Sequence, residues 1–190
     1  IRVPNATVKQ VVNADPNQID LDPFFDAIDK ATGDLITTSC GFLSPFQNEL
    51  EGICDVPFIS SSLRQLEHLK NIYTPPELQI ITFDAAKLGP THLPIGCEAF
   101  NTSVCGLNSD AHLKSIIENN ITHIDISKAS ADICAVVRAN KKNLTKGILL
   151  ECTNLPPYKS DIRRISDVPI YDILTAIEKE LPDSVNPYFL

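Results

Sequence analysis

The chain repeats part of itself: residues 36–63 and 148–175 share a pattern at a constant offset of 112 positions, with no gap. At this offset Cys40 coincides with Cys152. The further coincidences are Leu43 with Leu155, Pro45 with Pro157, Phe46 with Tyr158, Ile53 with Ile165, and the Asp-Val-Pro triplet at 55–57 with the one at 167–169. An internal repeat indicates two similar structural units, so the fold must be one that can be built twice from the same local plan.

Both copies show the same order of features. A short aliphatic run leads to the cysteine, and a short helical segment, a turn at an aspartate and a second apolar run after Val-Pro come after it. In parallel α/β sheets, ligands bind beyond the carboxyl ends of the strands, which is where each cysteine would lie. If the halves face each other about a pseudo-twofold axis, Cys40 and Cys152 approach one cleft from opposite sides. Their sulfurs would then lie about 7 Å apart, which leaves room for one substrate carbon and two proton transfers.

Hydrophobic periodicity predicts alternating strands and helices along the whole chain. The predicted strands cover residues 6–12, 34–38, 56–60, 78–83, 99–104, 147–151 and 169–171, and the predicted helices cover residues 23–30, 43–51, 63–69, 110–118, 130–140, 156–165 and 173–181. This alternation is typical of the α/β class with parallel sheets. We expect two lobes, with residues 1–74 and 173–190 in the first lobe and residues 75–172 in the second.

Composition limits the partners that the chain can bind. The 190 residues carry a formal net charge of −8, and the pI is near 4.9. This balance argues against nucleic acid and anionic membranes, because both are bound by clustered Lys and Arg. No apolar run approaches the roughly 20 residues that span a bilayer. We therefore expect a small-molecule ligand and a cytoplasmic location, and self-association into a homo-oligomer stays open.

The cysteine pattern gives no sign of a metal site or of a disulfide framework. The six cysteines are Cys40, Cys54, Cys97, Cys105, Cys134 and Cys152. None forms a Cys-x-x-Cys pair, and no histidine lies at zinc-ligand spacing. Reduced thiols of a cytoplasmic protein are therefore the simpler interpretation, and no metal is expected.

Two of the cysteines are candidates for chemistry, and the other four are read as buried packing residues, the usual role of a free cysteine. Cys40 and Cys152 each stand before a predicted helix start, where the helix N-terminus should lower the thiol pKa. One thiolate and one thiol on opposite sides of a substrate can move a proton from one face of a carbon to the other.

A carboxylate substrate also needs hydrogen-bond donors beside the thiols. The candidates adjacent to the cysteines are Ser39, Gly41, Thr153 and Asn154, and two further candidates at predicted strand ends are Ser61 and Thr82. The alternative interpretation of the polar side chains next to the cysteines is that they cap helices, and the two roles are compatible.

The segments around the two cysteines also resemble a known family. The sequence ITTSCGFL contains Cys40, LECTNLPPY contains Cys152, and DVPIYDIL comes after the second motif. These segments look like the signatures of the aspartate/glutamate/hydantoin racemase superfamily. The resemblance implies two pseudo-symmetric α/β lobes and a cofactor-independent racemase or epimerase of an amino acid or related carboxylate, with the two cysteines as paired acid and base.

Two other functions stay open beside this isomerase. One is a decarboxylase or isomerase of a small diacid on the same scaffold, and the other is a paralogue that binds a carboxylate without turning it over. The resembling proteins begin with a further strand and a Gly-Asn-Pro segment, and neither precedes residues 1–12 here. Either the chain continues ahead of residue 1, or the first lobe lacks its first strand.

Overall fold

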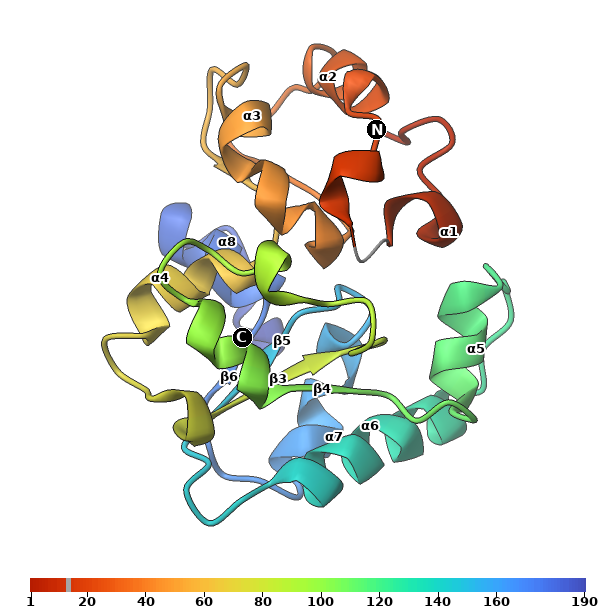
Figure 1. The fold of residues 1–190 in the computed structure, drawn as a ribbon, viewed down its shortest axis with the longest axis vertical. Helices are drawn as coiled ribbons and strands as arrows, with labels where there is room; N and C mark the ends of the chain where they lie inside the picture. Colours follow the sequence, from red (N-terminus) through yellow and green to blue (C-terminus); the bar gives the residue numbers. More distant parts are fainter. Residues whose placement is uncertain (13–14) are drawn as a thin grey trace.

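A computed structural model describes residues 1–12 and 15–190. The described chain is a mixed α/β structure with two parallel sheets flanked by helices (Figure 1). The smaller sheet pairs β1 (Ile36–Thr37) with β2 (Phe58–Ile59). The larger sheet has the strand order β4-β3-β5-β6, formed by Val104–Gly106, Leu78–Thr82, Gly147–Leu150 and Ile170–Tyr171.

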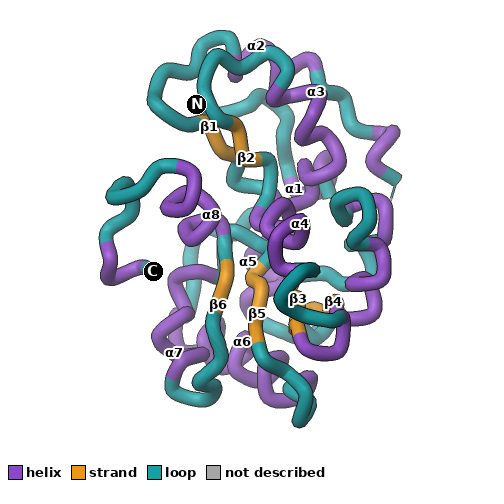
Figure 2. Tube along the Cα trace, turned by 90° about the vertical axis from the view of Figure 1, so that its left-hand side faces the viewer, coloured by secondary structure: helices purple, strands orange, loops and turns teal. Residues whose placement is uncertain are grey.

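Helices supply most of the remaining structure. The α-helices are α1 (Val8–Val11), α2 (Asp22–Ile28), α3 (Gln47–Glu51), α4 (Leu66–Leu69), α5 (His112–Glu118), α6 (Ile126–Asn140), α7 (Lys159–Arg163) and α8 (Ile173–Glu180). The 3-10 helices are η1 (Pro16–Gln18), η2 (Gly41–Phe46), η3 (Ser62–Gln65), η4 (Pro75–Glu77), η5 (Pro90–His92), η6 (Glu98–Ser103), η7 (Pro156–Tyr158) and η8 (Pro187–Phe189). In Figures 1 and 2, α1, α2, α3 and the small sheet form an upper part, above a body built on the large sheet.

The repeat has a structural counterpart. In both copies a strand leads to the cysteine, a 3-10 helix and a short α-helix come next, and the following strand pairs in parallel with the first. The register is also repeated: Ile36 pairs with Phe58, and Ile148, 112 positions later, pairs with Ile170. The sheets that contain these units have two and four strands, so the repeat holds locally while the surrounding structures differ in size.

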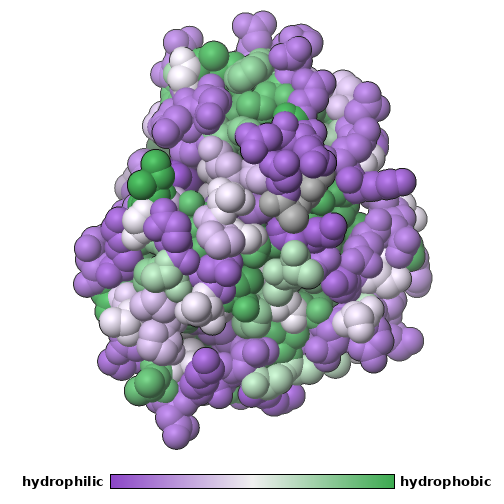
Figure 3. Space-filling model, viewed as in Figure 1, coloured by the Kyte–Doolittle hydropathy of each residue, from purple (hydrophilic) through white to green (hydrophobic). Residues whose placement is uncertain are grey.

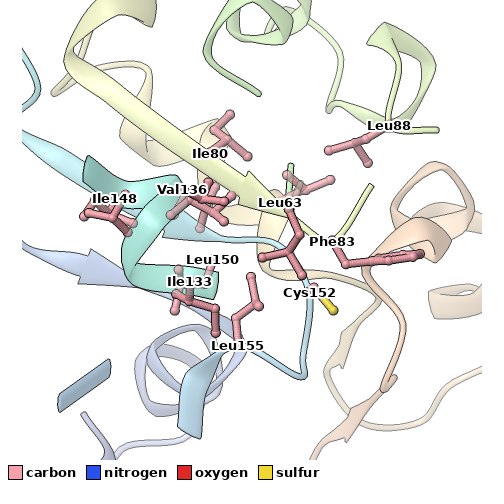
Figure 4. Close-up of a cluster of buried hydrophobic side chains, with 14 of the residues drawn as sticks. Leu63, Ile80, Phe83, Leu88, Ile133, Val136, Ile148, Leu150, Cys152 and Leu155 are labelled. Carbon is pink, nitrogen blue, oxygen red and sulfur yellow. The ribbon is translucent and has the colours of Figure 1, made fainter. Parts of the chain in front are cut away.

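The main core forms around β3 and β5, whose residues are all buried. Helix α6 packs against this core through Ala129, Ile133, Val136 and Val137. Their spacing of four, three and one residues places them on one helical face. Figure 4 shows Ile133 and Val136 beside strand residues of the cluster, with Cys152 at its edge. The end of β5 thus belongs to the main hydrophobic core of the molecule.

Helix α6 starts four residues earlier than the predicted 130–140. Asp125 is the reason, because its side chain accepts a hydrogen bond from the backbone N–H of Lys128 at 3.1 Å and caps the helix. A cap of this kind supplies a partner for one of the free N–H groups at a helix start. The helix therefore includes the polar stretch from residue 126 that the apolar pattern alone does not mark.

The predicted strand at 6–12 is wrong, because this segment contains α1. Val8, Val11 and Val12 fit the helical spacing of three and four as well as they fit an alternating pattern. Thr7 decides between the two, since its hydroxyl and backbone N–H both donate to the Gln10 side chain, at 2.8 and 3.4 Å. This local pairing at a helix start favours the helix.

The predicted strand at 99–104 is also wrong over most of its length. Residues 98–103 form η6, and only Val104 begins β4. The N–H of Phe100 bonds to the carbonyl of Cys97 at 2.9 Å, and the Ser103 hydroxyl donates to the carbonyl of Pro75. Those bonds satisfy the backbone N–H of Phe100 and the hydroxyl of Ser103 without a partner strand, so the segment gains little from sheet pairing.

Residues 13 and 14 lie outside the described residues, and the segment after them contains η1. Across residues 1–12 and 15–190, no helix combines the length and the apolar character that a bilayer crossing requires.

Candidate functional site

A cavity of about 360 Å³ lies where the upper part of the molecule meets the end of β5. Both Cys40 and Cys152 line it. Its apolar wall comes mainly from the beginning of the chain and from α2, through Ile1, Val3, Val8, Val11, Val12 and Phe24. Apolar atoms are also visible on the surface of this upper part in Figure 3. The cavity is the size of a small-ligand site.

The two cysteines reach this cavity from equivalent places in the repeat. Cys40 comes after β1 as the residue before η2, and Cys152 lies two residues beyond the last residue of β5. Their loops are directly joined, because the Thr153 hydroxyl donates to the carbonyl of Ser39 at 2.5 Å. The structure therefore brings together two thiols that are 112 positions apart in the sequence.

Burial changes the acidity of both thiols in the direction opposite to our prediction. Desolvation, followed by the negative charge of Glu151, raises the pKa of Cys40 and of Cys152 to about 12 each. The backbone N–H groups of Phe42 and Asn154 do act to lower these pKa values, as expected for donors at helix starts. Their effect is smaller than that of burial, so the prediction of lowered thiol pKa values is wrong.

Glu151 is the site residue that the sequence analysis missed. The residue is 1% exposed, lines the same cavity and directly precedes Cys152. Neither carboxylate oxygen has a hydrogen-bond partner. Desolvation raises its pKa to about 7, and the nearby Thr82 hydroxyl offsets part of this rise without making a full hydrogen bond. The signal in the sequence was a single carboxylate at the end of an otherwise apolar strand.

Gly41 makes the position of Glu151 possible. A Cβ atom at position 41 would lie 1.9 Å from Oε1 and 2.8 Å from the backbone oxygen of Glu151. Real Cβ atoms do not approach that closely, so only glycine lets the two copies of the repeat come together here. The carboxyl group of one copy thus packs against the residue directly after the cysteine of the other.

The predicted donors divide into two groups. Ser39, Gly41, Thr153 and Asn154 all line the cavity, and the Asn154 side-chain amide lies 3.6 Å from the sulfur of Cys152. Ser61 and Thr82 are fully buried and do not line it. The Ser61 hydroxyl accepts the N–H of Leu63 at 3.1 Å and caps η3.

The other four cysteines lie away from this cavity. Cys97 and Cys134 are buried, Cys54 and Cys105 are half-buried, and all four are free thiols, as are Cys40 and Cys152. Among the described residues, no group of three or more His, Cys, Asp or Glu side chains is arranged to hold a metal ion. The groups that the described residues offer at the cavity are therefore two thiols, one carboxyl group, the guanidinium of Arg2 and neutral donors.

Known proteins similar to this chain are lyases. No protein-family model matches the chain. A dimethylsulfoniopropionate lyase of Durusdinium sp. clade D is 29% identical over 175 residues, which cover 82% of this chain and 55% of that protein. Dimethylsulfoniopropionate lyase 7 of Emiliania huxleyi (strain CCMP1516) is 26% identical over 172 residues, covering 81% and 49%. The chain spans about half the length of the curated relatives it matches.

These relatives overturn the expected activity. They are named as lyases, and no family model supports the racemase superfamily. The assignment to that superfamily, and with it the racemase or epimerase activity and the isomerase class, is therefore wrong. The alternative of a decarboxylase-type enzyme is closer, because a lyase also breaks a bond to carbon rather than inverting a centre.

Proposed function

We propose that the protein is a lyase that acts on dimethylsulfoniopropionate or a closely similar β-sulfonio carboxylate. The observation that carries this proposal is the pair of thiols, Cys40 and Cys152, on one cavity of a chain whose relatives are named for this reaction. The apolar wall of the cavity also suits a substrate whose sulfonium bears two methyl groups.

The reaction is an elimination across two carbons. A thiolate removes a proton from the carbon next to the carboxylate, the electron pair forms a carbon–carbon double bond, and the carbon–sulfur bond breaks. The electron pair of that bond stays on sulfur, so neutral dimethyl sulfide leaves together with acrylate. The proton remains on the thiol that acted as base. Positioned acid–base groups of this kind contribute about 100- to 10,000-fold to a rate.

The neutral donors would hold the carboxylate of the substrate. Ser39, Gly41 and Asn154 line the cavity on both sides of the thiols, through side chains or backbone N–H groups. Donors at this position stabilise the charge that builds up on the carboxylate when the neighbouring carbon loses its proton. We assign Thr153 to positioning, because its hydroxyl is already bonded to Ser39.

We further infer that the two copies of the repeat belong to two lobes that face each other about a pseudo-twofold axis. The repeated register of the strand pairs supports this arrangement. Helix α8 supports the division in which residues 173–190 join residues 1–74, because Ile173 and Ala176 pack against Ile59 of β2. The active site would then lie between the lobes.

The test is the release of dimethyl sulfide and acrylate from dimethylsulfoniopropionate by the purified protein, measured by gas chromatography and NMR. Cys40→Ser and Cys152→Ser should each lower this activity, the base variant by about 100- to 10,000-fold. Cys54→Ser is the matched control, since Cys54 is a half-buried thiol outside the cavity, and it should keep wild-type activity. A wild-type protein that binds the substrate without cleaving it would refute the proposal and favour the carboxylate-binding alternative.

A further inference from the structure

An elimination releases one proton in each turnover, whereas a reaction that returns the proton to the substrate releases none. Each turnover converts one zwitterionic substrate into neutral dimethyl sulfide, an acrylate anion and one proton. The thiol that removed the proton is left protonated and must lose that proton to water before the next turnover. This inference rests on the proposed function, and it concerns the group that carries the proton away.

Glu151 is placed to be that group. It directly precedes Cys152, it packs against Gly41 next to Cys40, and it lines the same cavity as both thiols. Its charge acts on both, because it raises the pKa of each cysteine. A buried carboxyl group normally has hydrogen-bond or ionic partners, since burial without them is costly. Both oxygens of Glu151 lack them, so the structure holds this carboxyl group in a position that does not stabilise the fold.

The other groups that face Glu151 do not provide an alternative proton acceptor. From β3, Thr82 presents a hydroxyl, which is neutral. From η3, the Ser62 hydroxyl donates to the backbone carbonyls of Leu150 and Glu151, at 2.8 and 3.3 Å. Arg2 lines the cavity and is a permanent cation, which cannot accept a proton. The two thiols are therefore the titratable partners of Glu151 at this site.

We propose that Glu151 is the proton relay of the site, taking the proton from the basic thiol and passing it to water. In the first step the S–H proton moves to the carboxylate, which gives a thiolate and a carboxylic acid. The thiolate then removes the substrate proton and becomes a thiol again as dimethyl sulfide leaves. The carboxylic acid finally releases its proton to water in the cavity. One proton reaches solvent in each cycle, as the overall reaction requires.

The bound substrate would make the first step easier. Without a cation beside the thiols the proton stays on sulfur, because the thiol pKa lies far above that of Glu151. A sulfonium cation in the same cavity favours the thiolate by direct attraction. The thiol would thus ionise mainly when a cationic substrate is present, and Glu151 acts through the thiol as a positioning residue rather than by touching the substrate.

The experiment compares Glu151→Gln with Glu49→Gln, an exposed carboxylate on α3. In the wild type, kcat should rise as the pH increases through about 7, because the carboxyl group must be ionised to accept a proton. Glu151→Gln should lose the proton transfer from the thiol to the carboxylate, so its kcat at neutral pH should be at least about tenfold lower than that of the wild type. The difference in kcat should shrink at alkaline pH, where the thiol ionises unaided. KM should change little. Glu151→Asp should restore part of the neutral-pH rate, and Glu49→Gln should keep the wild-type profile.

A second measurement does not depend on turnover. The rate at which iodoacetamide alkylates Cys40 and Cys152 rises with pH as the thiols ionise. This rise should occur at lower pH in Glu151→Gln than in the wild type, because the variant has lost a negative charge beside the thiols. A wild type that releases no dimethyl sulfide refutes the proposed function. Two results with an active wild type refute the relay alone. One is a loss of kcat in Glu151→Gln that is the same at every pH, and the other is an unchanged pH profile of alkylation in this variant.

Discussion

Replacing Gly41 by alanine tests the contact on which the site is built. The new Cβ would lie 1.9 Å from Oε1 of Glu151, so this oxygen would have to retreat by about 1.5 Å to restore an ordinary 3.4 Å contact. Rotation of the side chain can relieve that clash. The contact of 2.8 Å with the backbone oxygen of Glu151 cannot be relieved in this way, so the loop before η2 or the end of β5 must also move.

Overpacking of this kind costs about 1–3 kcal/mol, and we expect the upper part of this range because backbone must shift. Gly89→Ala is the matched control, since a Cβ there meets no atom within 4 Å and the backbone lies in the extended region at φ −104° and ψ 179°. The control should be neutral or more stable by up to about 1 kcal/mol. Urea unfolding at one pH gives both values.

A double-mutant cycle assigns the cost of Gly41→Ala to its partner. Two of the three close contacts involve the side chain of Glu151, at 1.9 and 2.7 Å, and one involves its backbone. The loss in free energy of unfolding caused by Gly41→Ala should therefore be smaller, but still measurable, when Glu151 is already alanine. If Gly41→Ala is as stable as Gly89→Ala, or if its cost is the same in both backgrounds, Glu151 does not lie against Gly41 and the geometry of the site is incorrect.

Three further predictions concern buried groups. Lys159→Met should cost about 3–5 kcal/mol in urea unfolding, because it leaves Asp172 buried without the ammonium group 2.9 Å away, and the additional change Asp172→Asn should recover part of this loss. Ile133→Ala should cost about 2–5 kcal/mol at a fully buried position, whereas Ile126→Ala, at a residue that is 69% exposed on the same helix, should stay within about 0.5 kcal/mol of wild type. The pKa of Glu151 is raised from 4.5 to about 7 on folding, so the folded state binds more protons between these values. As the pH rises from 4.5 to 7, the free energy of unfolding of the wild type should therefore fall by about 3 kcal/mol relative to that of Glu151→Gln. Unfolding curves of both proteins across this pH range measure the difference.

Long apolar runs made the central strands predictable. Residues 78–83 and 147–151 each exceed the observed β3 and β5 by a single residue, because strands buried on both faces read as continuous hydrophobic stretches. The segments at 6–12 and 99–104 were misread because they are short and their apolar residues fit more than one period. Hydrogen bonds of Thr7 and Phe100 to nearby residues, and of Ser103 to the distant Pro75, decide their structure, and those bonds are not visible in a hydrophobic pattern.

The candidate site was predictable only where the repeat marks it. The constant offset singles out Cys40 and Cys152, and both line one cavity. The repeat does not mark Glu151, since its burial arises from contact with Gly41 in the other copy. The apolar wall was missed for a different reason: Val8 and Val11 reach the cavity from a helix that the pattern suggested was a strand.

The motifs alone did not identify the reaction, because the same thiols suit several reactions. A thiol beside a bound carboxylate can begin any reaction that starts with loss of the neighbouring proton, and the group on the substrate's next carbon decides the product. A sulfonium group on that carbon leaves as dimethyl sulfide, and the proton must then be carried to solvent. Cys40 and Cys152 would look alike in all of these reactions, so the proposed lyase activity rests, beyond the thiols, on the carboxyl group of Glu151 and the apolar wall of the cavity. Both arise from contacts between distant segments, so they become visible only once the chain has folded.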